Sequence, residues 1–272
     1  MKTVVITGGT DGMGAALASH YLRESERVVV VGRSRVKFEA LLAALAADDP
    51  ATTDRASFIA ADLSLTAESR RVVEQIKARH ERVDVLVLAA SFIRQKRHET
   101  VEGHEASWVL FFVSKYILTT GLTSLLADSD HPTVVNISVP GARVEAIDFD
   151  DLESVRCFSF IRSNAQQRRA NELLGILATV ENPTLAYLTW GPRRLVKTSF
   201  AGDVGWVMKM SSVILGAVAA QRPADAIEPI IALVADPPTG RAAYRGAARV
   251  PLVHGPHDAD DAYRLATAIK EY

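Results

Sequence analysis

A glycine-rich turn near the start of the chain, Thr7-Gly8-Gly9-Thr10-Asp11-Gly12-Met13-Gly14, constrains the fold most. It follows the apolar run 4–6 and leads into the helix-forming run 15–18, as a strand–turn–helix unit does. Gly8 allows a tight turn, Gly12 lets the backbone approach a pyrophosphate, and Gly14 lets the helix pack closely. The free N–H groups and positive dipole end of such a helix hold phosphates. The turn therefore predicts a dinucleotide site; the alternative is an ordinary turn that binds nothing.

Composition limits the remaining possibilities. The chain has 272 residues, 48% of them hydrophobic, which suffices for one α/β domain over residues 1–272. A formal net charge of −1 argues against nucleic-acid and membrane partners, which usually need clustered positive charge. The single cysteine, Cys157, excludes an internal disulfide and a cysteine-based metal site. With no leader-like segment and no apolar run long enough to cross a bilayer, we expect a cytoplasmic protein without a metal.

The residues after the second predicted strand, 27–32, indicate which cofactor is bound. An NAD site usually has an acidic residue here to hold the ribose 2′-hydroxyl, but this chain has Gly32 followed by Arg33 and Ser34. A guanidinium and a hydroxyl suit a 2′-phosphate. We therefore expect NADP or NADPH; the alternative is that Arg33 is only a solvated loop charge.

The T-G-x-x-x-G-x-G spacing, Asp62-Leu63 after a strand at 57–60, and the Val-Asn-Ile-Ser segment ending at Ser138 resemble the short-chain dehydrogenase/reductase family. The resemblance covers the whole chain. It implies a single Rossmann-type α/β domain, a doubly wound sheet of about seven parallel strands, and a mobile substrate lid at about 193–220. Polar residues 166–169 stand where the family has its usual helix-pair interface, so the oligomeric state is left open.

The same resemblance implies which residues bind the cofactor. They are Gly8, Thr10, Asp11, Gly12, Met13, Gly14, Arg33, Ser34, Asp62, Leu63, Ala89, Ala90, Ser91, Ser138 and Gly191. Asp62 has an alternative role, because it could cap the helix predicted near Ala67. Residues 88–91, Leu-Ala-Ala-Ser, replace the family's Asn-Asn-Ala-Gly, which keeps small residues near the cofactor but loses two amides that steady the sheet.

The family's catalytic side chains are replaced. In the long helix predicted over 106–126, Phe112 stands at the position of the family's Asn. Val139 replaces the serine that polarises the carbonyl, and Phe160 and Asn164 stand at the Tyr and Lys positions of Tyr-x-x-x-Lys. The catalytic residues are thus unknown from sequence; an active site rebuilt from Ser91, Ser138 or Arg162 is one possibility.

Apolar and aromatic residues dominate the predicted substrate side. Five residues are expected to line the substrate: Val139, Phe160, Phe200, Trp206 and Met210. Flat aromatics and adaptable methionines suit a large planar ligand, although a lid helix packing on the core uses the same residues. The pattern resembles atypical reductases of aromatic polyketide tailoring in antibiotic biosynthesis. We therefore expect an NADPH-dependent ketoreductase of an angucyclinone-like carbonyl; the alternative is an inactive NADP-binding pseudo-enzyme with a sensing or structural role.

Overall fold

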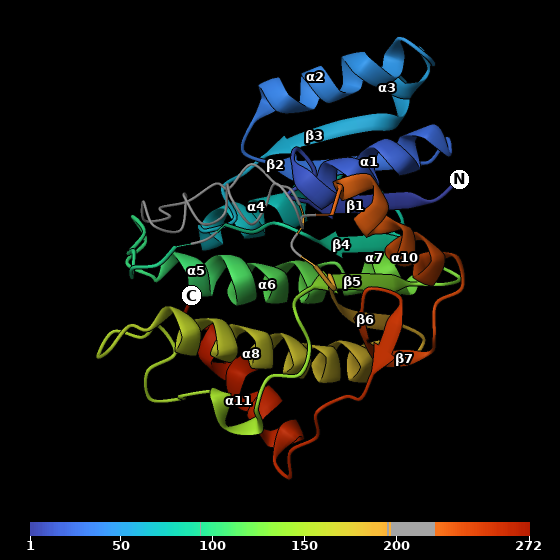
Figure 1. The fold of residues 1–272 in the computed structure, drawn as a ribbon. Coiled ribbons are helices and arrows are strands. Elements are labelled where there is room, and N and C mark those ends of the chain that lie inside the picture. Colours follow the sequence, from blue (N-terminus) through green and yellow to red (C-terminus); the bar gives the residue numbers. More distant parts are fainter. Residues whose placement is uncertain (93, 195, 197–220) are drawn as a thin grey trace.

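A computed structural model describes residues 1–92, 94–194, 196 and 221–272. Its described part contains an eight-stranded sheet in the order β3-β2-β1-β4-β5-β6-β7-β8 (Figure 1). The strands are β1 (Thr3–Thr7), β2 (Arg27–Gly32), β3 (Ala56–Ala60), β4 (Val85–Leu88), β5 (Thr133–Ile137), β6 (Ala186–Gly191), β7 (Gly240–Arg245) and β8 (Ala248–Val250). Strands β1 to β7 pair in parallel, as predicted for a doubly wound sheet.

The last strand differs from the prediction. The resemblance implies about seven parallel strands, but a further strand, β8, folds back antiparallel on β7. The turn between them contains Gly246 with φ of +59°, a conformation that favours glycine. The hairpin therefore adds an eighth, antiparallel strand at the edge of the sheet.

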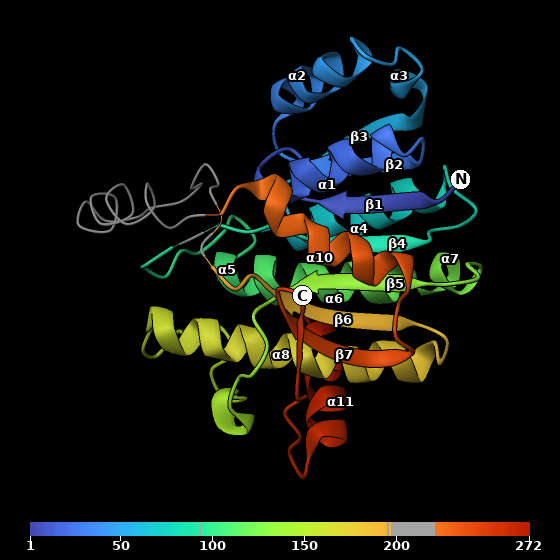
Figure 2. The same cartoon turned by 45° about the vertical axis from the view of Figure 1, so that its right-hand side comes forward.

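Helices cover both faces of the sheet (Figures 1 and 2). One face packs against α1 (Gly12–Arg23), α2 (Arg35–Ala46) and α10 (Pro223–Ala235). The other packs against α4 (Thr66–Lys77), α6 (Ser114–Gly121) and α8 (Phe160–Glu181), and α11 (Asp258–Ile269) lies on α8. The short helices are α3 (Thr52–Arg55), α5 (Ala106–Trp108) and α7 (Thr123–Ala127). Residues 28–31 are almost unexposed, as expected for a parallel strand covered on both faces.

The segment predicted as one helix over 106–126 is broken into pieces. A π-helical turn, Val109–Val113, separates α5 from α6, and Leu122 separates α6 from α7. Within it, the carbonyl of Phe111 accepts a hydrogen bond from Asn171 Nδ2 of α8 at 2.7 Å. Such wide turns often occur at functional sites. This one lies near the carboxyl ends of β1 and β4. From these two neighbouring strands the sheet continues outward to β2 on one side and to β5 on the other.

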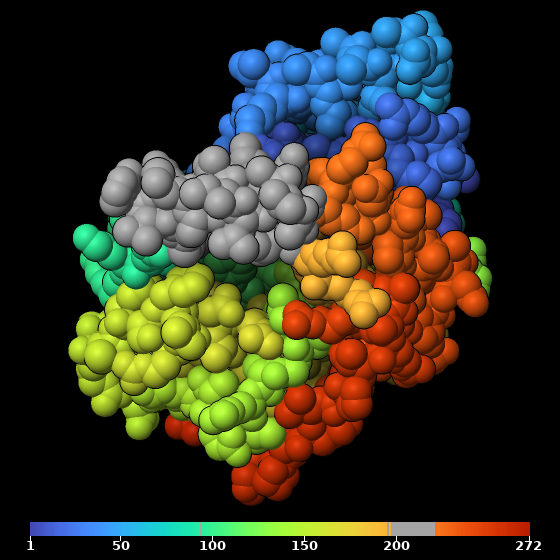
Figure 3. Space-filling view, in the orientation of Figure 1, coloured from blue at the N-terminus to red at the C-terminus, as the bar shows by residue number. Residues whose placement is uncertain are grey.

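The space-filling view shows the two ends of the molecule, with α2 and α3 in blue at one end and the segments around α8 and α11 in yellow-green and red at the other (Figure 3). Within the described residues, we find no helix that is long and apolar enough to span a membrane.

Candidate cofactor and active site

The glycine turn after β1 is closely packed. Gly8 and Gly12 have φ of +67° and +52°, which favours glycine at both positions. A Cβ at Gly8 would lie 2.8 Å from the Cα of Ala90, and one at Gly14 would lie 2.3 Å from the carbonyl oxygen of Gly8. Because Gly14 has no side chain, the first turn of α1 can pack directly against the backbone of Gly8. Asp11 caps α1, since its Oδ1 accepts from Gly12 N at 2.7 Å.

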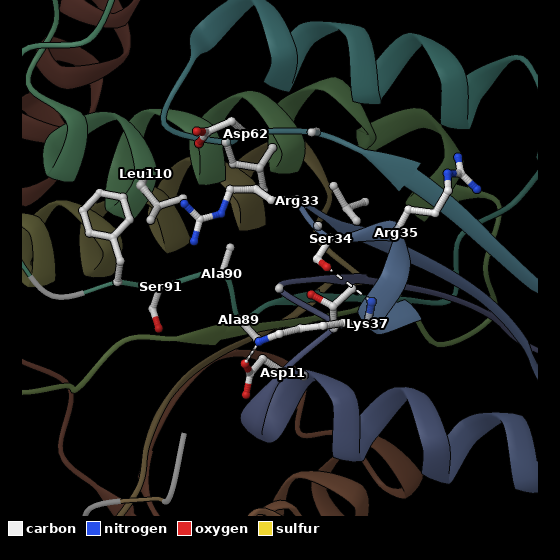
Figure 4. A pocket seen from close by; sticks show the side chains of 18 of the residues that line it. Asp11, Arg33, Ser34, Arg35, Lys37, Asp62, Ala89, Ala90, Ser91 and Leu110 are labelled. Carbon is white, nitrogen blue, oxygen red and sulfur yellow. Dashed lines mark hydrogen bonds and ion pairs between the residues drawn. The ribbon is translucent and has the colours of Figure 1, made fainter. Parts of the chain in front are cut away.

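This turn borders a cavity of about 720 Å³ at the carboxyl ends of β1, β2 and β4 (Figure 4). Twelve predicted cofactor residues line it: Gly8, Thr10, Asp11, Met13, Gly14, Arg33, Ser34, Asp62, Leu63, Ala89, Ala90 and Ser91. Gly12, Ser138 and Gly191 are not in its lining. Residues that the sequence did not indicate also contribute, among them Lys37, Phe92 and Leu110. The size, the glycine cradle and the cations fit a dinucleotide.

The end of β2 supplies the charged side chains of this cavity. In Figure 4 the guanidinium of Arg33 extends into the cavity toward Leu110, on the side of Asp62. Arg35 turns away, with its guanidinium carbon 5.2 Å from the ring centre of Phe58. Ser34 Oγ accepts from Lys37 N at 3.2 Å and so begins α2 three residues before the predicted start. Arg33 is therefore a cation at the end of β2 whose side chain enters the cavity.

Asp62 does not cap α4, which corrects one of its two predicted roles. Its Oδ1 accepts from the backbone N and the hydroxyl of Ser64, at 3.0 and 2.7 Å, within its own turn. The helix is capped by Glu102, whose carboxylate accepts from Thr66 N at 2.6 Å and Ala67 N at 3.1 Å. Glu102 comes from a loop that is distant in sequence, so no local pattern indicated it.

Thr7 fixes the loop after β4 beside the glycine turn. Its Oγ1 accepts hydrogen bonds from Ala89 N at 3.0 Å and Ala90 N at 3.2 Å. These bonds hold the backbone of residues 89 and 90 against Gly8. A Cβ at Gly8 would lie too close to both of them. The side chain of Thr7 is buried, so water does not compete for these hydrogen bonds.

At the substrate end, α8 makes a contact that the sequence did not indicate. Arg168 meets the end of β5, with Nε donating to the carbonyl of Val139 at 2.7 Å and Nη2 donating to that of Pro140 at 3.1 Å. Phe160, the first residue of α8, is 39% exposed. Asn164 is partly buried one helical turn before Arg168. Arg168 is thus the α8 side chain bonded to this end of the sheet, and the assignment of Phe160 and Asn164 to the family's Tyr and Lys positions stays a prediction.

The remaining predicted substrate-side residues are only partly placed. A Cβ at Gly191 would lie 3.0 Å from the Cα of Val139, and Ser138 N donates to Trp190 O at 2.9 Å, so the ends of β5 and β6 touch. Phe112 packs in the core, with its ring 4.8 Å from that of Trp108. Leu110 is the residue of that segment that lines the cavity. The predicted residues Phe200, Trp206 and Met210, and most of the predicted lid, lie outside the described residues.

A buried polar network lies under this end of the sheet. Lys115 Nζ donates to Asn136 Oδ1 at 2.8 Å and to the carbonyl of Ile137 at 3.0 Å. Asn136 Nδ2 donates to Asn171 Oδ1 and to Tyr187 Oη, both at 2.6 Å. Burial lowers the pKa of Lys115 to about 7 and raises that of Tyr187 well above its usual range. The sequence analysis did not identify this network. The signal that could have indicated it is Lys115, a lysine within an apolar stretch.

The fold and the cavity define a dinucleotide-binding α/β protein of the Rossmann type. Residues 2–149, more than half of the chain, match the family model described as short chain dehydrogenase. The chain therefore belongs to the short-chain dehydrogenase/reductase family, and it is an oxidoreductase of that type.

Known relatives agree with this assignment. Human polyprenol dehydrogenase is 26% identical over 79% of this chain and 67% of its own length. Human retinol dehydrogenase 14 is 27% identical over 63% of this chain and 54% of its own length. The chain therefore spans about half to two thirds of these relatives.

Solved structures agree in fold. A short-chain dehydrogenase from Streptomyces avermitilis has a TM-score of 0.63 at 21% identity and covers 99% of this chain and 94% of its own. One from Sphingobium yanoikuyae in complex with NADPH has a TM-score of 0.65 at 18% identity and covers 100% and 95%.

Proposed function

We propose that this protein is an NADPH-dependent ketoreductase that acts on a carbonyl of a polycyclic aromatic, angucyclinone-like polyketide. One observation carries the proposal. A closely packed glycine turn borders a cavity at the carboxyl ends of β1, β2 and β4. By the family resemblance, Val139, just after β5, stands at the position of the polarising serine. The site is thus equipped to bind a cofactor while its substrate end offers an apolar side chain in place of the usual hydroxyl.

The cofactor half follows from the residues that line the cavity. The turn 8–14 and the first N–H groups of α1 would hold the pyrophosphate, and the guanidinium of Arg33 would pair with a 2′-phosphate. Asp11 and Asp62 are the carboxylates of the described lining, and neither stands at the end of β2, where a carboxylate would repel that phosphate. NADPH, when bound, supplies the hydride, and the protein supplies position and electrostatics.

The proton would come from the substrate. General acid catalysis usually contributes about a hundredfold to ten-thousandfold. A phenol already hydrogen-bonded to the carbonyl oxygen makes a side-chain acid dispensable, because its proton passes to that oxygen as the hydride arrives at carbon. The phenolate that remains then regains a proton from water. The guanidinium of Arg168, which is bonded to the carbonyls of Val139 and Pro140 at the end of β5, would favour such an anion.

The test follows NADPH oxidation by absorbance and the product by mass. The panel contains hydroxylated angucyclinones and anthraquinones, the same compounds with the phenol methylated, and a simple aliphatic ketone. Because two relatives are named for polyprenol and retinol, the aldehydes of those alcohols are included. Turnover of the free phenols alone is the expected result. Tight NADPH binding without turnover of any compound would favour the non-catalytic, NADP-binding protein instead.

A further inference from the structure

An opening in the hydrogen-bond ladder lies between the ends of β4 and β5. Strand β4 ends at Leu88, which pairs with Asn136, so β5 extends beyond it. Ser138 N is directed to β6, where it donates to Trp190 O at 2.9 Å. Since successive residues of a strand direct their backbone groups to opposite neighbours, the carbonyl of Ile137 is turned to the side that β4 has left. A carbonyl in this partly buried position is satisfied by another donor.

Lys115 of α6 provides that donor. Its Nζ is bonded to the carbonyl of Ile137 at 3.0 Å and to Asn136 Oδ1 at 2.8 Å, and the residue is 3% exposed. Two N–H bonds are all that an uncharged amine has to donate. An ammonium would have a third N–H and a full charge to satisfy, which is costly in a dry interior. The two acceptors thus match the amine.

The surroundings of Lys115 offer no compensating charge among the described residues. From β6, Tyr187 is uncharged, because burial raises its pKa. From α8, Glu172 accepts from Gly141 N at 2.7 Å and from Arg169 at 3.2 Å, and Arg168 is bonded to Val139 and Pro140. From β5 and the π-helical turn come an amide and backbone carbonyls. The hydrogen bonds of Lys115 are therefore both to neutral groups, the amide of Asn136 and the carbonyl of Ile137.

We propose that Lys115 is a positioning residue of the cofactor site, and that its uncharged amine closes the end of β5 beside the point where β4 stops. The loop that leaves β4 at this point, residues 89–91, lines the cofactor cavity. In this chain, residues 88–91 lack the two amides that steady the sheet in the family, and the amine of Lys115 together with Asn136 takes that place. The inference rests on the proposed binding of NADPH.

The proposal predicts a pH-dependent affinity. When Lys115 becomes charged, the end of β5 must open to admit water, and on this proposal the opening disturbs the adjacent loop that lines the cavity. The amine fraction of a group with a pKa of about 7 falls from about nine tenths at pH 8 to about one tenth at pH 6. If only the amine form binds, the apparent Kd for NADPH rises about tenfold over that range.

The experiment measures NADPH binding by calorimetry at pH 6, 7 and 8, without substrate. The wild type is compared with K115M, which cannot titrate, with K115Q, which keeps two N–H donors, and with K77M, a matched control on the exposed side of α4. Titration of the cofactor's own phosphate is common to all four proteins and cancels in the comparison. Thermal unfolding of each variant shows that it is folded.

The expected result is a steeper pH dependence in the wild type and K77M than in K115M and K115Q, by about tenfold between pH 8 and pH 6. K115Q is expected to bind more tightly than K115M, because it restores the donors. Equal pH dependence in the wild type and K115Q, with only the unfolding temperature changed, would overturn the inference. Absence of NADPH binding by the wild type at every pH would instead overturn the proposed function, and this inference with it.

Discussion

Removing Lys115 should change how the stability of the protein depends on pH. Burial holds the pKa of Lys115 near 7, against 10.5 in the unfolded chain. Between these values the unfolded chain binds a proton at this position that the folded protein does not. The free energy of unfolding therefore rises with pH across this window and is lowest below about pH 7, where the folded protein must accommodate the ammonium.

The magnitude follows from the two pKa values. One pKa unit corresponds to about 1.4 kcal/mol, so this lysine adds about 2.5 kcal/mol of stability between pH 8 and pH 10. The variant K115M should lack that increment. Its absolute stability is less informative, because the carbonyl of Ile137 and Oδ1 of Asn136 each lose a hydrogen bond, at about 1–3 kcal/mol per buried acceptor.

The assay is urea unfolding, followed by circular dichroism, at pH 8, 9 and 10. The quantity compared is the difference in unfolding free energy between the wild type and K115M, in which the titration of other groups cancels. K77M, at an exposed position of α4, should remain parallel to the wild type. If the wild type and K115M are parallel over this range, Lys115 is charged in the folded protein and the argument from its two neutral acceptors is wrong.

Three further predictions concern the cofactor and the reaction. R33A should weaken NADPH binding by about tenfold to a hundredfold, the loss of one charge-assisted contact, and leave NADH binding unchanged in calorimetry; equal losses for both cofactors would exclude a 2′-phosphate contact. G14A should abolish NADPH binding while the chain still folds, because its Cβ would lie 2.3 Å from the carbonyl oxygen of Gly8; a variant that binds normally would show that the turn adapts. F160Y should leave kcat within about twofold, because Phe160 lies two helical turns before Arg168 and is 39% exposed; a large gain would place the missing acid at that position.

Local sequence patterns predicted the strand–turn–helix unit beside the cavity. The strand, glycine turn and helix at residues 3–23 are encoded by adjacent residues, and their roles depend on backbone conformation, which glycine at positions 8 and 14 largely determines. The β-branched run of β2 predicted a strand buried on both faces. Twelve of the fifteen residues expected around the cofactor line one cavity, because each follows the carboxyl end of a parallel strand.

The substrate half depended on register, which a single sequence determines poorly. The family's Tyr-x-x-x-Lys pattern can be aligned with a helix of apolar and polar residues one turn earlier or later, because residues four apart share a face. The structure brings Arg168 to the carbonyl of Val139, a contact that the sequence did not indicate. In the same way Phe112 belongs to the core, because the π-helical turn rotates the residues around it, and Leu110 faces the cavity.

The sequence by itself determined the class of fold and the glycine turn that borders the cavity, because these follow from periodicity and from glycine within short stretches. Only the tertiary structure decided which distant side chains complete the site. Glu102 caps α4 and Lys115 closes the end of β5 through contacts between residues far apart in the chain. Such contacts satisfy buried polar groups, and their partners are specified by the packing of whole elements rather than by neighbouring residues.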